Sequence, residues 1–177
     1  MGEISDRSLR MLATAIEKEK QGMQFYEKAV SDCTNKLAQE IFRTLAAEEA
    51  IHIKRAKEIH DSLQAGTSWS EDWKSYKQEN ENLQKLFRDR IAKVGAEVIA
   101  DASDVKAVEI GLEFEQGAID FYEKELAGAT DSVEKEFIER MIQEERTHYA
   151  SLSDLKLYLS DPAAWFSEVE RHGLDGA

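Results

Sequence analysis

The sequence predicts an all-α protein, an antiparallel four-helix bundle, on three observations. The chain has 177 residues with one proline and 9 glycines, and its richness in Ala, Glu, Lys and Leu favours helix. Its apolar residues recur at alternating steps of three and four, which keeps one face of a helix towards its neighbours. Four segments have this pattern, and short links join them in pairs, so that the paired helices are antiparallel.

Within a single domain that covers 1–177, the four helices are expected at 6–32, 36–64, 104–127 and 131–159. Their apolar stripes begin at Leu9, Phe42, Val105 and Ile138. Asn35 is expected to cap the second helix, Ser103 or Asp104 the third, and the segment 130–134 the fourth, because short polar side chains bind the free N–H groups of a first turn.

A long crossover, 65–102, is expected between the second and third helices. A helix of ~25 residues is roughly 38 Å long, so the chain needs such a segment to return along the bundle. Its apolar residues predict an amphipathic helix within the crossover, through Leu83, Leu86, Phe87, Ile91 and Val94. Three aromatic residues are expected to pack this crossover against the bundle: Trp69, Trp73 and Tyr76.

The C-terminal extension, 160–177, is expected to form a short helix that starts at Pro162. Trp165 and Phe166 would then cover one end of the bundle, and a contact in a homodimer is the alternative use for them.

The acidic composition excludes several functions. The net charge of −13 leaves no basic footprint for nucleic acid. No apolar run approaches the ~18 residues of a membrane span, and the first residues lack the pattern of a secretory signal. We therefore expect a cytoplasmic protein that binds neither nucleic acid nor membrane. The single cysteine, Cys33, provides no disulfide framework.

An internal repeat carries the functional prediction. Two copies of one pattern are separated by 96 positions, so that each stripe contains polar residues at matching levels. These residues are Glu19, Glu49 and His52 in the first copy and Glu115, Glu145 and His148 in the second.

Four carboxylates in the centre of a bundle would be costly, because each buried ion costs several kcal/mol and like charges repel. Two divalent cations remove this difficulty. Bundles that hold two iron or manganese ions use one Glu from each of two helices and Glu-x-x-His from each of the other two, and this chain matches on all six positions. We expect two iron ions, with manganese or zinc as alternatives.

Neighbouring residues have less defined roles. Glu48 and Glu144 lie beside the stripes, where they are either surface residues or groups that orient an imidazole. Tyr26 and Tyr122 follow Glu19 and Glu115 by seven positions on the same helix face. Each is either a packed core residue with a satisfied hydroxyl or a catalytic residue bonded to a ligand carboxylate.

The paired motifs resemble the rubrerythrin branch of the ferritin-like superfamily over roughly residues 5–160. They read Glu19-x6-Tyr26 with Glu48-Glu49-x-x-His52, and Glu115-x6-Tyr122 with Glu144-Glu145-x-x-His148. The resemblance implies a ferritin-like bundle with a non-haem di-iron centre, in which Glu49 and Glu145 bridge the metals while Glu19 and Glu115 are terminal. It also implies reaction with hydrogen peroxide or dioxygen.

The chain departs from the rubrerythrin pattern at two points. It has no Cys-x-x-Cys pair, so electrons are expected from an external donor such as a separate rubredoxin-like protein. Ala118 stands three residues after Glu115, where rubrerythrins carry a further Glu. The predicted function is that of a di-iron oxidoreductase that reduces peroxide. The alternatives are iron oxidation and handling as in ferritins, and a metal-binding structural bundle without turnover.

Overall fold

The computed structural model describes residues 2–76 and 100–167. These ranges contain four long helices and one 3₁₀ turn, with no strand: α1 (Gly2–Asp32), α2 (Lys36–Gln64), η1 (Asp72–Ser75), α4 (Ala102–Gly128) and α5 (Ser132–Ser160). The all-α prediction is confirmed. Two helices begin earlier than expected, α1 at Gly2 instead of position 6 and α4 at Ala102 instead of position 104.

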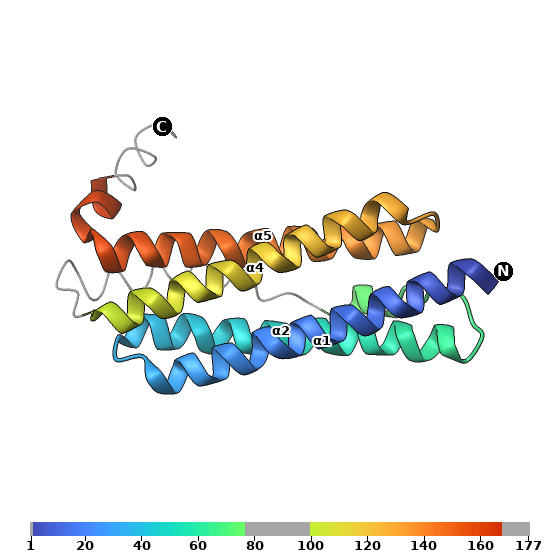
Figure 1. Ribbon diagram of the computed structural model, residues 1–177, viewed down its shortest axis with the longest axis horizontal. Coiled ribbons are helices and arrows are strands. Elements are labelled where there is room, and N and C mark those ends of the chain that lie inside the picture. Colours follow the sequence, from blue (N-terminus) through green and yellow to red (C-terminus); the bar gives the residue numbers. More distant parts are fainter. Residues whose placement is uncertain (1, 77–99, 168–177) are drawn as a thin grey trace.

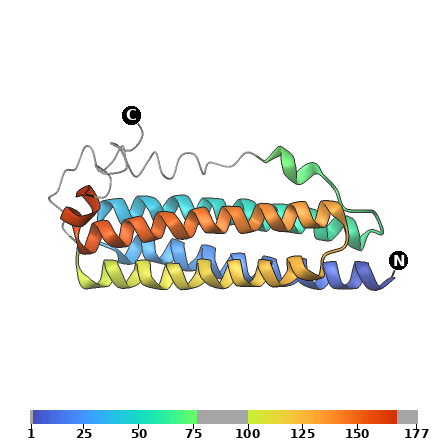
Figure 2. The same ribbon diagram turned by 90° about the horizontal axis from the view of Figure 1, so that it is seen from above.

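The four long helices form an antiparallel bundle with the ring order α1, α2, α5, α4 (Figures 1 and 2). The α1–α2 hairpin is one layer and the α4–α5 hairpin is the other, as Figure 1 shows. Since α2 ends at one end of the bundle and α4 begins at the opposite end (Figure 2), a long crossover is required, as predicted.

Side-chain caps begin three of the helices. Asn35 accepts a hydrogen bond from the backbone N–H of Ala38 at the start of α2, as predicted, and Asp131 caps α5. The prediction for α4 was wrong, because Asp101 is the cap and forms a capping box with Asp104. The segment offers several acidic and hydroxyl residues in a row, and capping preference alone does not rank them.

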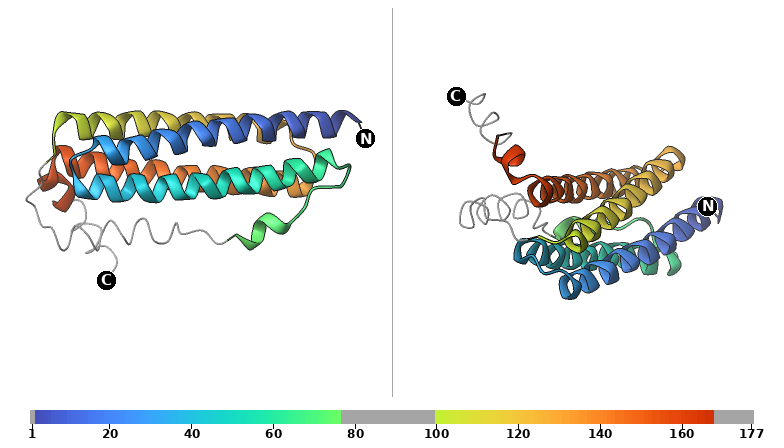
Figure 3. Two further views of the ribbon diagram at one scale, coloured as in Figure 1. Left: turned by 90° about the horizontal axis from the view of Figure 1, so that it is seen from below. Right: turned by 60° about the vertical axis from the view of Figure 1, so that its left-hand side comes forward.

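The beginning of the crossover packs against α2 and α5. Figure 3 (left) shows η1 beside α2. The rings of Trp69 and Trp73 lie 5.9 and 5.5 Å from the ring of Phe137, measured between centroids. The predicted amphipathic helix of the crossover lies outside the described residues.

The chain continues after α5 with a helical turn at 162–167. There Trp165 is buried, and its ring packs edge-on against Tyr158, with 5.7 Å between centroids. Trp165 therefore covers one end of the bundle, as predicted.

Two apolar clusters fill the bundle on either side of a polar layer. One cluster contains Tyr26, Phe42 and Leu155, and the other contains Leu12, Ile59 and Phe137. On each long helix the residues between the two clusters include the predicted ligands. None of the helices in the described part of the chain is long and apolar enough to cross a membrane.

Candidate metal centre

The six residues predicted as ligands come together in the polar layer of the bundle. Each has at most 3% of its surface exposed. They form two overlapping groups, and within each group one ligand atom per residue lies within 4.8 Å of all the others. The first group is Glu19, Glu49, His52 and Glu145, and the second is Glu49, Glu115, Glu145 and His148.

Glu49 and Glu145 belong to both groups. The Nδ1 atom of His52 lies 3.3 Å from Oε2 of Glu49 and 3.1 Å from Oε1 of Glu145. The Nδ1 atom of His148 lies 3.3 Å from the other oxygen of each carboxylate. Each of these two carboxylates therefore extends one oxygen to each group, which is the arrangement of a bridging ligand. Glu19 and Glu115 belong to one group each.

The two imidazoles are held from outside by the carboxylates that precede the bridging pair. His52 Nε2 lies 2.7 Å from Oε2 of Glu144, and His148 Nε2 lies 2.5 Å from Oε2 of Glu48. Both carboxylates are buried. Of the two roles considered for Glu48 and Glu144, the orienting role is confirmed and the surface role is wrong. A carboxylate that accepts from Nε2–H leaves Nδ1 free to face the centre.

Two arginines that the sequence analysis did not select bind Glu144. Arg55 donates from Nη1 to Oε2 of Glu144 at 2.7 Å and from Nη2 to the backbone oxygen of Tyr76 at 2.9 Å. Arg140 donates from Nε to Oε1 of Glu144 at 2.6 Å. Arg55 is only 2% exposed. The sequence did contain a signal for Arg55, because it is a charged residue three positions after His52 and beside the buried stripe.

The two tyrosines bind ligand carboxylates across the repeat. Tyr26 donates to Glu115 and Tyr122 donates to Glu19, and both rings are fully buried. The predicted bond to a ligand carboxylate is present, but it joins opposite copies. Gly111 makes room for Tyr26, since a Cβ atom there would lie 3.3 Å from Cε1 of that ring.

Electrostatic forces in the centre favour bound protons or cations. Burial, followed by repulsion from Glu145, raises the pKa of Glu19 well above its usual 4.5, and burial raises the pKa of Glu115 against the attraction of His148. Burial alone would lower the pKa of His52 and His148, but the surrounding carboxylates raise it well above 6.5. In a centre without cations, burial therefore favours the protonated forms of Glu19 and Glu115, and the surrounding carboxylates favour the protonated forms of both imidazoles.

Several buried polar atoms in the centre have no hydrogen-bond partner. They include one oxygen of Glu49, both oxygens of Glu145 and the Nδ1 atoms of His52 and His148. Unsatisfied buried groups of this kind are rare in proteins, and a bound ion or water is a common explanation for them. Carboxylate oxygens and imidazole nitrogens are the donors that iron, manganese and zinc accept. The residues present therefore fit two divalent metal ions.

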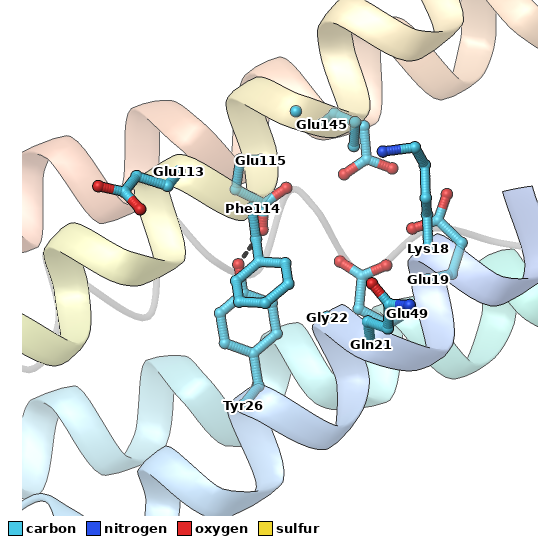
Figure 4. Close-up of a pocket in the computed structure, with 12 residues that line it drawn as sticks. Lys18, Glu19, Gln21, Gly22, Tyr26, Glu49, Glu113, Phe114, Glu115 and Glu145 are labelled. Carbon is cyan, nitrogen blue, oxygen red and sulfur yellow. Dashed lines mark hydrogen bonds between the residues drawn. The ribbon is translucent and has the colours of Figure 1, made fainter.

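A cavity of about 160 Å³ opens onto the carboxylates from between α1 and α4. Figure 4 shows the side chains of Glu19, Glu49 and Glu145 gathered on one side of it, with Tyr26 and Phe114 on another. Neither histidine lines this cavity. The imidazoles thus approach the centre from the α2–α5 side, and this cavity opens on the α1–α4 side.

Comparison with known proteins agrees with this geometry. The family model described as Rubrerythrin matches residues 10–156. The chain belongs to the rubrerythrin family. Searches of curated proteins and of solved structures gave no match. Rubrerythrins are ferritin-like di-iron carboxylate proteins, so the family and the buried cluster together indicate a metal centre in this rubrerythrin.

Proposed function

We propose that this rubrerythrin is a non-haem di-iron oxidoreductase that reduces hydrogen peroxide. The observation that carries the proposal is the pair of shared carboxylates, Glu49 and Glu145, each of which extends one oxygen towards each histidine. Two metal ions that share both carboxylates would be able to act together on one small molecule.

Six residues would hold the two ions. His52 and Glu19 serve one position, His148 and Glu115 serve the other, and Glu49 and Glu145 bridge the two. The four carboxylates balance the charge of two divalent ions. This donor set supports iron, and it would also accept manganese or zinc.

The accessible side of the centre supports turnover over a purely structural role. A structural metal site is closed by protein ligands, whereas a catalytic site keeps an open side. Here the cavity between α1 and α4 leads to the carboxylates. Two ferrous ions held by these residues would supply the two electrons that, with two protons, reduce hydrogen peroxide to two molecules of water.

The tyrosines are proposed to hold protons beside the reacting groups. Burial, followed by the charge of Glu115, raises the pKa of Tyr26 well above 10. Burial and Glu19 do the same for Tyr122. Both hydroxyls therefore keep their protons and donate hydrogen bonds to the terminal carboxylates, which fixes the orientation of Glu19 and Glu115 towards the centre.

The decisive experiment is anaerobic loading with two equivalents of ferrous iron, followed by rapid mixing with hydrogen peroxide or with dioxygen, watched by absorbance. Faster oxidation by peroxide supports the proposal. Oxidation by dioxygen that is as fast or faster, with a large hollow assembly in solution, would instead favour iron storage. Absence of bound metal after loading would contradict the metal centre itself.

Re-reduction between cycles is proposed to come from an external electron donor, such as a rubredoxin-like protein, in the cytoplasm. A reduced rubredoxin added to the oxidised protein is expected to return the iron to the ferrous state. Failure to do so would exclude donors of this type.

A further inference from the structure

The cavity beside the carboxylates is larger than hydrogen peroxide requires. Its volume of about 160 Å³ is comparable with an engineered protein cavity of ~150 Å³ that binds benzene. Benzene and tert-butyl hydroperoxide have the same number of non-hydrogen atoms. Metal ions among the carboxylates would occupy the inner part of the space, and the opening between α1 and α4 leaves room for a substituent that points outward.

Small residues on both helices create this space. Gly22 and Ala118 occupy equivalent positions in the repeat, three residues after Glu19 and Glu115. A Cβ atom at Gly22 would lie 3.9 Å from the nearest atoms of Glu49, and one at Gly117 would have nothing within 4 Å. A Cβ atom at either position would therefore meet no backbone atom of a neighbouring helix within 4 Å. The small residues at these positions therefore leave the cavity open.

The remaining walls suit a neutral molecule with an apolar group. The ring of Phe114 lines the cavity beside Tyr26 (Figure 4), and it is fixed by stacking on Phe25 with 5.1 Å between centroids. Once the four central carboxylates are balanced by two divalent ions, the charged wall residues are Lys18 and Glu113, whose charges cancel. Neither an anion nor a cation is favoured over an uncharged substrate.

We propose that the cavity admits small organic hydroperoxides, of the size of tert-butyl hydroperoxide, as a second class of oxidant. The inference rests on the proposed peroxide reduction and names a further substrate class for the same centre. The hydroperoxide group faces the carboxylates, and the alkyl group lies against Phe114 towards the opening. Cleavage of the O–O bond takes up two electrons, one from each ferrous ion, and two protons, and it yields an alcohol and water.

Binding is tested first without turnover, on protein loaded with zinc, which is not reduced or oxidised. Saturation-transfer NMR is expected to detect contact between the protein and the methyl groups of tert-butyl hydroperoxide. The variant Gly117→Leu places a side chain in the cavity and should weaken this contact. Leu also has a higher helix propensity than Gly, so the variant should fold.

The matched control is Gln116→Leu, which adds the same side chain at an exposed position that does not line the cavity. This variant should bind the hydroperoxide as the unchanged protein does. Metal analysis must give equal zinc content for all three proteins. No transfer to the unchanged protein, or equal transfer to the Gly117→Leu variant, would overturn the inference.

Kinetics then separate this inference from the proposed function. Ferrous protein should be oxidised by both hydrogen peroxide and tert-butyl hydroperoxide. Gly117→Leu should slow the second reaction by roughly tenfold or more relative to the first, the scale of a steric change in a pocket. Reaction with hydrogen peroxide alone would refute the inference and leave the proposed function standing. Reaction with neither oxidant would refute the proposed function, while the zinc experiment still decides whether the cavity binds hydroperoxides.

Discussion

The two halves of the chain provide the same ligands but different supports for them. The α1–α2 and α4–α5 hairpins each contribute two carboxylates, one imidazole and one tyrosine, at positions 96 residues apart. The two arginines that bind Glu144, in contrast, have no such counterparts. Arg55 corresponds to Ser151, whose hydroxyl donates to the backbone oxygen of Thr147 at 2.9 Å on its own helix.

Arg140 differs from its counterpart in the same way. The equivalent position in the first hairpin is Thr44, whose hydroxyl donates to the backbone oxygen of Glu40 at 3.0 Å. The two copies of the repeat therefore have the same ligand residues facing the centre and different residues one layer further out. The two groups of predicted ligands match in residue type but have different surroundings, and substitutions at paired positions can separate these two layers.

The largest effect is expected from removing a shared carboxylate. Glu49→Ala should lower the affinity for both metal ions by more than about 100-fold, beyond the 10–100-fold typical of residues that only support a ligand. Glu115→Ala should weaken one position and spare the other. Titration with Co²⁺, followed by absorbance, measures both positions.

Glu113→Ala is the control for these variants, because Glu113 is an exposed carboxylate two residues before Glu115 on α4. It should bind two ions as before. If the Glu49→Ala variant retained both ions at full affinity, the bridging role would be wrong.

A smaller effect, on folding stability, is expected at the pair that distinguishes the halves. Arg55→Met leaves the buried carboxylate of Glu144 without one of its two arginines, and loss of a buried ion-pair partner costs about 3 kcal/mol. Ser151→Ala removes only a hydroxyl contact and should cost about 1 kcal/mol or less. Denaturant unfolding of the metal-free proteins measures the difference, and equal losses would show that the arginine is not specifically required.

Metal affinity should rise with pH. The pKa of Glu19 and that of Glu115 are raised well above 4.5, mainly by burial, so these groups carry protons in the metal-free protein at pH values where a free Glu is ionised. A divalent ion must displace these protons. Affinity should therefore increase above pH 4.5, by up to about tenfold per pH unit for each proton displaced. Calorimetric titration in two buffers of different ionisation enthalpy counts the protons, and a pH-independent affinity would contradict the assignment.

The smallest effect is expected at the contact that seats Tyr26. A Cβ atom at Gly111 would lie 3.1 Å from Cδ1 of Leu152 and 3.3 Å from Cε1 of Tyr26, so both side chains must shift. Gly111→Ala should thus destabilise the protein by about 1 kcal/mol, after the crowding is offset by the better helix propensity of Ala. Gly117→Ala, where the new methyl group meets nothing within 4 Å, should be neutral or stabilising in the same thermal unfolding measurement.

Much of the centre could be predicted from the sequence, because helical spacing alone places Glu49 on the stripe and Glu48 beside it. Spacing within one helix says nothing about contacts between helices. The bond from Tyr26 to Glu115 instead of Glu19 depends on which helices are neighbours. The role of Arg55 likewise depends on a partner 89 positions away. The cap of α4 was missed for a local reason, since Asp101, Ser103 and Asp104 are all good caps.

The hydrogen bonds from each tyrosine to the opposite half have a consequence for assembly. A single helical hairpin with the sequence of one copy would contain two of the four central carboxylates and one imidazole, and its tyrosine would lack its observed acceptor, which lies on the other hairpin. Two identical hairpins related by a twofold axis would restore every one of these contacts. The present chain thus resembles a symmetric dimer of two hairpins. The crossover joins the two hairpins covalently, and a dimer of separate hairpins would not need it.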